Sequence, residues 1–309
     1  MSTKEVQVPF VEGEIDFDVP AAGKPVKTHY WVYGDLKSGK TPLVGLHGGP
    51  GIPHAYMSVL SDLTTAHGIP VVLYDQIGCG LSTHLPEKKG DSSFWTVQLF
   101  VDELDNVLTK LEIKDNFDLY GHSWGGMLAT SFAIRQPKGL KRLVLASSIG
   151  RIQDWVDAAM KLRGTLPQET QDILEKHEAA DTTEDPEYEE AVKGYYAQFV
   201  IRVESDVMGQ SFTDFLQDPT VYHTMLGPNE FTVIGTLKDF DVTSELHKIE
   251  VPTLLTSGRW DGAQDNVIRP LWTGIPKSKW VLFAESSHLP QLEERQRVME
   301  TVGYFLTTS

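Results

Sequence analysis

Ser123 stands in the setting of an activated nucleophile. Gly121, Ser123 and Gly125 form a G-x-S-x-G pattern, and apolar residues occur on both sides of it, in 117–119 and 127–129. This arrangement predicts a strand, a sharp turn with the serine at its apex, and a helix. The glycines are needed because such a turn packs the strand and the helix too closely for a side chain. We therefore expect Ser123 to attack an electrophilic carbon.

A serine hydroxyl is weakly nucleophilic at neutral pH, so it needs a base that is itself oriented by a carboxylate. His288 is the candidate base because it follows a predicted strand near the end of the chain. Asp261 is the candidate carboxylate, since it lies in a loop directly after an apolar strand. Asp265 is the reserve candidate, although it also suits the cap of the helix predicted to begin near 266. The chain order serine, aspartate, histidine is the one expected when successive strands deliver the three groups.

Acyl transfer also requires two backbone N–H groups that bind the developing oxyanion. Trp124, directly after the nucleophile, should supply one, and the glycine-rich loop 47–51 should supply the other, with Gly49 the preferred residue. Neither a G-x-G-x-x-G pattern nor a Walker lysine is present, which argues against a nucleotide site. We expect structural roles for His47, which begins the glycine loop, and for His122, whose side chain the turn should direct elsewhere.

The elements around these residues alternate between strand and helix, which predicts an α/β fold with a mostly parallel central sheet and helices on both faces. Three short strands at 6–10, 13–19 and 26–33 should form an antiparallel edge. Further strands are predicted at 41–46, 70–74, 117–119, 140–147, 249–258 and 279–284, and helices at 57–67, 94–111, 124–136, 266–272 and 295–306.

The alternation stops between 151 and 240, where the sequence is helix-like, acidic and rich in aromatic residues. We expect this segment to be a helical cap inserted into a core made of residues 1–150 and 241–309. The acidic stretch 181–190, which Pro186 interrupts, should be a solvated loop or the start of a helix.

Composition narrows the classes of partner. The chain has 309 residues, 40% of them hydrophobic, and a net charge of −16, which argues against nucleic acid and anionic membranes. Cys79 is the only cysteine, and neither a signal-like N-terminus nor a run of about 20 apolar residues is present. We therefore expect a cytoplasmic protein. We expect no metal, because nothing stands at metal-ligand spacing, and no other cofactor. The oligomeric state is left open.

Three segments resemble the proline iminopeptidase and amino-acid amidase branch of the α/β-hydrolase superfamily. They are the loop 47–51 (HGGPG), the loop 75–82 (DQIGCGLS) and the turn 121–126 (GHSWGG), and the resemblance covers nearly the whole chain. It implies an α/β-hydrolase fold and a cofactor-free serine hydrolase. It also implies that Glu230, in the segment 227–231, binds the free N-terminal amine of the substrate. A carboxylate in a half-buried pocket pairs well with an ammonium group.

One position departs from this family pattern. A second acidic residue often follows the triad aspartate in the family aminopeptidases, whereas Gly262 follows Asp261 here. Asp265 could replace the missing carboxylate, and the cap aromatics could line an apolar pocket for a ring such as that of proline or could form the core of the cap. These aromatics are Trp155, Tyr195 and Phe231.

The expected function is release of an N-terminal residue, with proline preferred, from short peptides, or hydrolysis of amino-acid amides, through an acyl-enzyme on Ser123. Two alternatives stay open. One is an esterase or lactonase acting on a specialised small molecule, and the other is a non-catalytic ligand receptor on the same scaffold.

Overall fold

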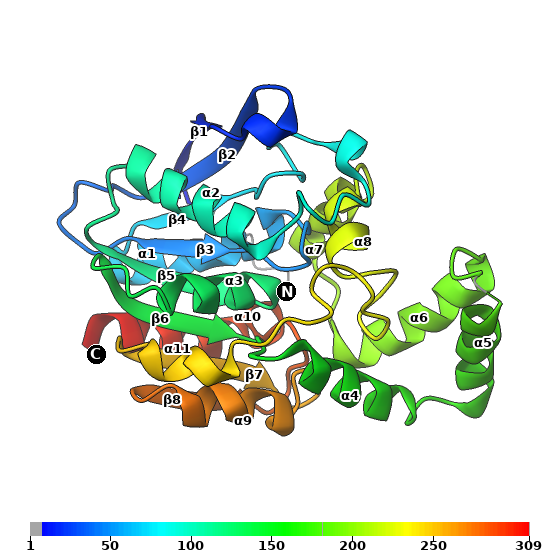
Figure 1. Cartoon of the computed structure of the whole chain (residues 1–309). Coiled ribbons are helices and arrows are strands. Elements are labelled where there is room, and N and C mark those ends of the chain that lie inside the picture. Colours follow the sequence, from blue (N-terminus) through cyan, green and yellow to red (C-terminus); the bar gives the residue numbers. More distant parts are fainter. Residues whose placement is uncertain (1–7, 181, 309) are drawn as a thin grey trace.

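The computed structural model describes residues 8–180 and 182–308, and its centre is an eight-stranded sheet in the order β1-β2-β4-β3-β5-β6-β7-β8 (Figure 1). The strands are β1 (Phe10–Phe17), β2 (Val26–Tyr33), β3 (Leu43–Leu46), β4 (Val71–Tyr74), β5 (Phe117–His122), β6 (Leu140–Ala146), β7 (Thr253–Gly258) and β8 (Ser278–Phe283). β1 and β2 pair antiparallel at one edge, and β3 to β8 are parallel. The predicted mostly parallel α/β sheet is confirmed.

The N-terminal edge differs from the sequence prediction. The strand predicted at 6–10 lies partly outside the described residues, and a single strand, β1, runs from Phe10 through Gly13 to Phe17. The gap predicted at 11–12 is absent, because Val11, Glu12 and Gly13 all pair with residues of β2, and Gly13 lies opposite Tyr30. A Cβ at Gly13 would come within 2.8 Å of the Tyr30 hydroxyl. This glycine therefore makes room for a neighbouring aromatic ring.

Helices cover both faces of the sheet (Figure 1). They are α1 (Asp62–His67), α2 (Val97–Lys110), α3 (Trp124–Ala133), α9 (Asp265–Gly274), α10 (Pro290–Glu293) and α11 (Arg295–Thr308), with 3-10 helices η1 (Pro20–Ala22), η2 (His54–Ser61), η3 (Pro86–Lys88) and η4 (Thr243–Lys248). The helix predicted at 57–67 is thus α-helical only in its second half.

Two layers of core result from the alternation of side chains along each strand. On β4, the side chain of Val72 packs in a hydrophobic cluster with residues of α2, α3 and α9. The side chain of Val71 packs in a second cluster with residues of η2, α1 and α11. Because both faces are covered, β3 and β4 are apolar at every position rather than at alternate ones. This rigid sheet presents the carboxyl ends of its parallel strands at one edge.

Five α-helices of the described part of the chain lie between β6 and β7: α4 (Ile152–Arg163), α5 (Gln168–Ala179), α6 (Pro186–Phe199), α7 (Asp206–Phe215) and α8 (Thr220–Met225). α4, α5 and α6 project away from the sheet (Figure 1), whereas α7 packs against η2. Side-chain caps set two of the starts, since Asp185 accepts a hydrogen bond from the Glu187 N–H and Ser205 accepts one from the Met208 N–H. The predicted division at 150 and 240 fits these elements and stays a proposal.

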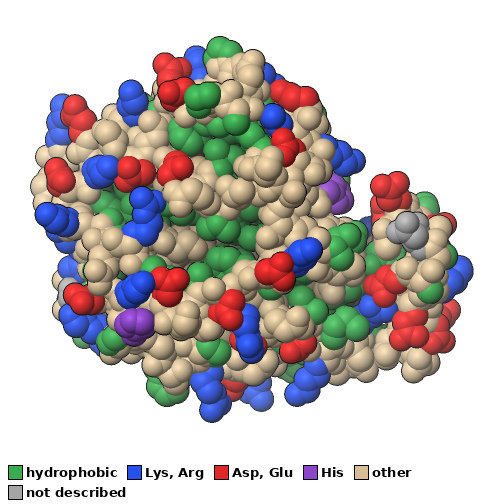
Figure 2. Space-filling view, viewed as in Figure 1, with side chains coloured by type: hydrophobic (Ala, Val, Ile, Leu, Met, Phe, Trp, Pro, Cys, Tyr) green, Lys and Arg blue, Asp and Glu red, His purple; other side chains and the backbone are tan. Residues whose placement is uncertain are grey.

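Acidic side chains gather on the outer end of this helical segment, as Figure 2 shows. Within the acidic stretch 181–190, α6 begins at Pro186, and most of the described side chains are exposed. Among the helices of the described residues, none has the length and apolar character that crossing a membrane would require.

Candidate active site

Ser123 lies at the apex of the turn between β5 and α3, with φ 55° and ψ −121°. A positive φ is costly for any residue with a side chain and is typically retained where function needs it. The flanking glycines permit the turn. A Cβ at Gly125 would stand 2.0 Å from the Leu46 carbonyl oxygen, and one at Gly121 would stand 2.3 Å from the Gly125 carbonyl oxygen. The close packing predicted for this turn is confirmed.

His288 and Asp261 come together from the loops after β8 and β7. The His288 Nδ1 and Asp261 Oδ1 atoms are 2.7 Å apart, and Asp261 has no exposed surface. A second hydrogen bond, from the Ala263 N–H at 2.8 Å, holds the same carboxylate oxygen. Since an ionised carboxylate only accepts hydrogen bonds, the Nδ1 atom of His288 carries the proton and its Nε2 atom is left as the basic nitrogen.

The charged groups around His288 make its imidazole more basic. Burial alone would lower the pKa of His288, but the charge and hydrogen bond of Asp261, with a further contribution from Glu230, raise this pKa above its usual value. A raised pKa makes the imidazole a stronger proton acceptor.

Ser123 and His288 both line a cavity of about 240 Å³ beneath the helical segment, together with Gly49 and Glu230. Ser123, Gly49 and Glu230 also line a small adjoining chamber of about 20 Å³, whose remaining wall includes Trp124. The sequence-predicted nucleophile, base, oxyanion donors and amine-binding carboxylate therefore meet in one place.

The two oxyanion candidates have suitable backbone positions. Trp124 is the first residue of α3, so its N–H has no carbonyl one turn earlier in the helix to bind. In the glycine loop, the Gly48 N–H already donates to the Tyr56 hydroxyl at 2.7 Å. The next N–H along the loop belongs to Gly49, which has φ +110° and lines both chambers.

Glu230 lies in the segment between α8 and β7 and is partly buried. Its Oε1 atom accepts a hydrogen bond from the Tyr222 hydroxyl at 3.1 Å, and its backbone carbonyl accepts one from Trp155 Nε1 at 2.7 Å. Burial raises the pKa of Glu230, while His288 and Tyr222 act in the opposite direction. A cationic group bound here would favour the charged carboxylate.

Comparisons with known proteins show the family to which this chain belongs. A family model described as alpha/beta hydrolase fold matches residues 41–295. The proline iminopeptidase of Saccharolobus solfataricus is 35% identical over 283 residues, which is 91% of this chain and 89% of that protein. The proline iminopeptidase of Clostridium botulinum is 36% identical over 286 residues, or 91% and 94% of the two chains. The chain belongs to the proline iminopeptidase family of α/β hydrolases.

Two crystal structures extend the comparison within this fold. That of VinJ is 45% identical, with a TM-score of 0.91, and the match covers 96% of this chain and 98% of the other. That of the proline iminopeptidase of Mycobacterium smegmatis is 38% identical, with a TM-score of 0.87 and coverage of 96% and 97%. Together the relatives support a hydrolase.

Trp155 takes the space beside Gly262. It lines the small chamber, which is one of the two placements that the sequence left open, and its ring centroid lies 5.2 Å from that of His288. A Cβ at Gly262 would come within 2.7 Å of the Trp155 ring. An acidic side chain at position 262 would therefore collide with this ring in its present place.

Three predicted substrate contacts lie elsewhere. Asp265 is exposed in the first turn of α9 and does not line either chamber, so the structure does not support it as a replacement carboxylate. Tyr195 and Phe231 are buried in the core of the helical segment, with ring centroids 5.3 Å apart. The neighbouring Tyr196 lines the cavity instead, because one residue along a helix rotates the side chain by about 100°.

Sequence reasoning missed the contacts of His122. Its side chain does not turn away from the site: the Nε2 atom lies 2.8 Å from the His288 carbonyl oxygen, and the Nδ1 atom lies 2.9 Å from the Tyr56 hydroxyl. Tyr222, which holds Glu230, was also missed. Adjacency to Ser123 was a signal for His122, whereas nothing in the sequence pointed to Tyr56.

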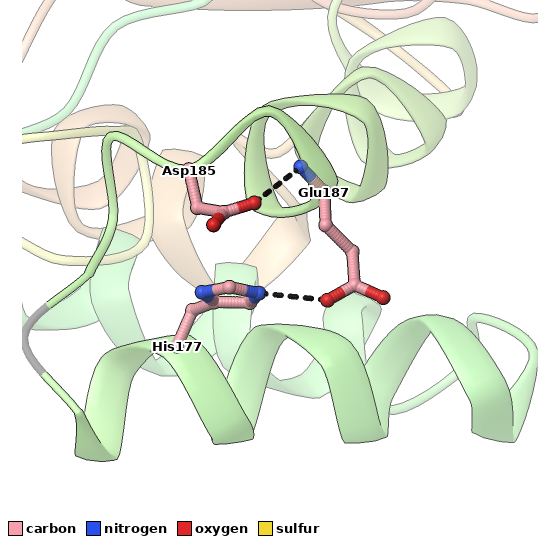
Figure 3. Close-up of side chains that lie close together, drawn as sticks. All are labelled: His177, Asp185 and Glu187. Carbon is pink, nitrogen blue, oxygen red and sulfur yellow. Dashed lines mark hydrogen bonds and ion pairs between the residues drawn. The ribbon is translucent and has the colours of Figure 1, made fainter.

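One group of side chains in the described part of the chain has metal-like spacing: His177, Asp185 and Glu187, drawn in Figure 3. Internal contacts already account for it. The His177 ring contacts Thr182 and Glu187, Asp185 accepts the Glu187 N–H, and Lys176 pairs with Glu187. A metal ion would compete with the Lys176 ammonium group, so we interpret the group as a structural link between α5 and α6.

Proposed function

We propose that this chain is a serine hydrolase that releases an N-terminal residue, proline or another small apolar residue, from short peptides or hydrolyses the corresponding amino-acid amides. The observation that carries the proposal is the placement of the Glu230 carboxylate in the same cavity as Ser123 and His288. A carboxylate at that point would pair with the free amine of a substrate whose carbonyl carbon lies at Ser123.

In the proposed cycle, His288 removes the proton of Ser123 as the oxygen attacks the carbonyl carbon, and Asp261 stabilises the imidazolium that forms. The N–H groups of Gly49 and Trp124 bind the oxyanion. The imidazolium then gives its proton to the leaving amine, which departs and leaves an acyl group on Ser123. Water, activated by His288, attacks this ester and releases the free amino acid.

The size of the small chamber supports a small acyl residue. It holds only about 20 Å³ between Trp155 and apolar side chains such as Met127 and Leu226. A compact apolar ring or methyl group fills such a space, whereas a longer side chain would require Trp155 to move. In this proposal the segment 151–240 is a cap that supplies Trp155 and Glu230 to the site.

A substrate panel tests the proposal. Proline arylamide, prolinamide and alanine arylamide are compared with their N-acetylated forms and with simple esters of acids that lack an amine. We expect turnover of the free-amine substrates and a loss of at least about 10²-fold in kcat/KM on acetylation, because Glu230 then faces an uncharged group. Equal turnover of free and acetylated substrates would reject the amine requirement, and turnover of esters alone would favour an esterase or lactonase.

A serine-reactive phosphonate tests the chemistry independently of the substrate. We expect the compound to label wild-type Ser123 and to leave the Ser123→Ala variant unlabelled. Failure to label the wild type, together with stabilisation of the protein by a proline derivative, would instead indicate a non-catalytic receptor.

A further inference from the structure

A continuous series of hydrogen bonds connects three loops of the candidate site. The Gly48 N–H donates to the Tyr56 hydroxyl at 2.7 Å, the Tyr56 hydroxyl contacts His122 Nδ1 at 2.9 Å, and His122 Nε2 contacts the His288 carbonyl at 2.8 Å. Gly48 belongs to the glycine loop, His122 to the nucleophile turn and His288 to the loop after β8. We call this series the Tyr56–His122 relay.

The chemistry of the partners fixes the direction of every bond. A carbonyl only accepts, so the His122 Nε2 atom carries the hydrogen. The Nδ1 atom of the neutral ring is then an acceptor, and the Tyr56 hydroxyl donates to it while accepting the Gly48 N–H. Burial and the nearby His288 lower the pKa of His122 to about 3, so its ring stays neutral at ordinary pH and the pattern does not reverse.

The relay is buried and closely packed. Tyr56 is 1% exposed and His122 is 3% exposed. A Cβ at Gly48 would lie 3.2 Å from the Tyr56 hydroxyl and 3.1 Å from the Ser123 Cβ atom, so the glycine lets the loop approach both. The imidazole of His122 also packs against that of His288, with 5.0 Å between ring centroids. Little room is left for any of these groups to shift alone.

We infer that Tyr56 and His122 are positioning residues, which hold the oxyanion donor of Gly49 and the base His288 in fixed places on either side of Ser123. The Gly48 N–H is hydrogen-bonded to the Tyr56 hydroxyl. This bond fixes the backbone of Gly48 and thereby orients the following peptide, which carries the Gly49 N–H. At its other end it anchors the backbone of the residue whose ring must take the Ser123 proton. The inference rests on the proposed function, because it assigns roles relative to Ser123, Gly49 and His288.

Tyr56→Phe tests the relay, since it removes one hydroxyl and keeps the ring. We expect kcat, per active site titrated with the phosphonate, to fall about 10- to 100-fold with little change in KM, because a misplaced donor or base weakens only the transition state. The acid limb of the pH profile should not move, since the His288–Asp261 contact is intact. Tyr120→Phe is the matched control: Tyr120 is equally buried, and its hydroxyl has no hydrogen-bond partner among the described residues.

His122→Gln and His122→Leu form the second comparison. A glutamine amide can donate to the His288 carbonyl and accept from Tyr56, whereas leucine can do neither. We expect His122→Gln to keep at least ten times the kcat of His122→Leu at equal fraction folded. A Tyr56→Phe variant with wild-type kcat per titrated site, or equal kcat for the two His122 variants, would overturn the inference.

The experiments distinguish failure of the relay inference from failure of the proposed function. The variants are compared on whichever substrate the wild type hydrolyses, ester or amide, and on the rate of phosphonate labelling. If the wild type hydrolyses only esters, the aminopeptidase proposal is rejected. The relay is then tested by comparing the variants on the ester substrate. A wild type that neither labels nor turns over any substrate would overturn both.

Discussion

The indole of Trp155 occupies the space that a side chain at position 262 would fill, and Gly262 is what permits it. The closest approach of a Cβ built on Gly262 to this ring would be 2.7 Å. The same indole donates to the Glu230 carbonyl at 2.7 Å and lines the small chamber. The identity of residue 262 is therefore coupled to the placement of Glu230, because one aromatic ring contacts both.

Gly262→Ala should impair recognition of the substrate amine. The added methyl group would displace Trp155 and strain its hydrogen bond to Glu230, so we expect a raised KM for proline arylamide, by about 5- to 50-fold, and a smaller loss in kcat. The double variant Gly262→Ala/Trp155→Phe should lose less than the sum of the two single losses, because phenylalanine relieves the contact with the added methyl group and already lacks the N–H that binds the Glu230 carbonyl. Gly194→Ala is the control, since nothing lies within 4 Å of a Cβ there. Strictly additive effects of the two site substitutions would contradict this coupling.

Ser123→Ala should abolish nearly all turnover, a decrease on the order of 10⁴-fold or more in kcat, because alanine has no hydroxyl to form the acyl-enzyme. Ser123→Gly should be equally inactive but more stable than the alanine variant by about 1 kcal/mol, since glycine tolerates a positive φ. Kinetic assays and thermal unfolding of both variants check this. Residual activity near the wild-type level would show that the nucleophile lies elsewhere.

Glu230→Gln should weaken discrimination in favour of free amines. The glutamine can still accept the Tyr222 hydrogen bond but carries no charge, so we expect KM for free-amine substrates to rise roughly 10- to 100-fold. Turnover of N-acetylated substrates should fall much less. Measuring kcat/KM for matched free and acetylated pairs tests the idea, and an unchanged ratio would return Glu230 to a structural role.

The same substitution should move the pH profile. Asp261 and Glu230 raise the pKa of His288 against the opposing effect of burial. Because the base acts only when neutral, activity should fall at a higher pH than it would with an unperturbed histidine. Removing the Glu230 charge lowers this pKa. The acid limb of kcat/KM for an uncharged ester should therefore shift to lower pH in Glu230→Gln. A shift to higher pH would contradict the electrostatic account.

From the burial of Glu103 we expect the protein to lose stability as the pH rises. Glu103 lines neither chamber of the candidate site. It is fully buried, it accepts hydrogen bonds from Thr28 and from the Ile77 N–H, and burial raises its pKa from 4.5 to about 8. The folded state therefore binds the proton more tightly than the unfolded state. Its stabilising effect should be complete below about pH 4.5 and lost as the pH rises to about 8, by a few kcal/mol in total.

Glu103→Gln isolates this contribution, because glutamine does not titrate. Relative to the wild type, the variant should gain thermal stability steadily between pH 5 and pH 8. Asp118 has a pKa that burial raises to about 7, but it is present in both proteins and cancels in the difference. Parallel curves of Tm against pH for the two proteins would show that Glu103 does not titrate in this range.

Local sequence patterns were sufficient to predict much of the fold. The turn at Ser123 was predictable because glycine spacing and flanking apolar runs are short-range features, and the same holds for the apolar strands β3 and β4. The prediction was wrong where pairing with a distant segment decides the outcome. The sequence predicted two strands, 6–10 and 13–19, but Val11 and Glu12 continue a single strand because they pair with β2.

The sequence by itself determined which types of group are available: a serine on a strained turn, a histidine and an aspartate after late strands, and a glutamate in the segment between β6 and β7. Only the tertiary structure decided which of them meet. Asp265 and Asp261 stand four residues apart, yet one is exposed and the other buried against His288. Tyr56 and His122, 66 residues apart, are hydrogen-bonded because the sheet brings the ends of β3 and β5 together. Such contacts depend on the packing of distant segments, which spacing along the chain does not encode.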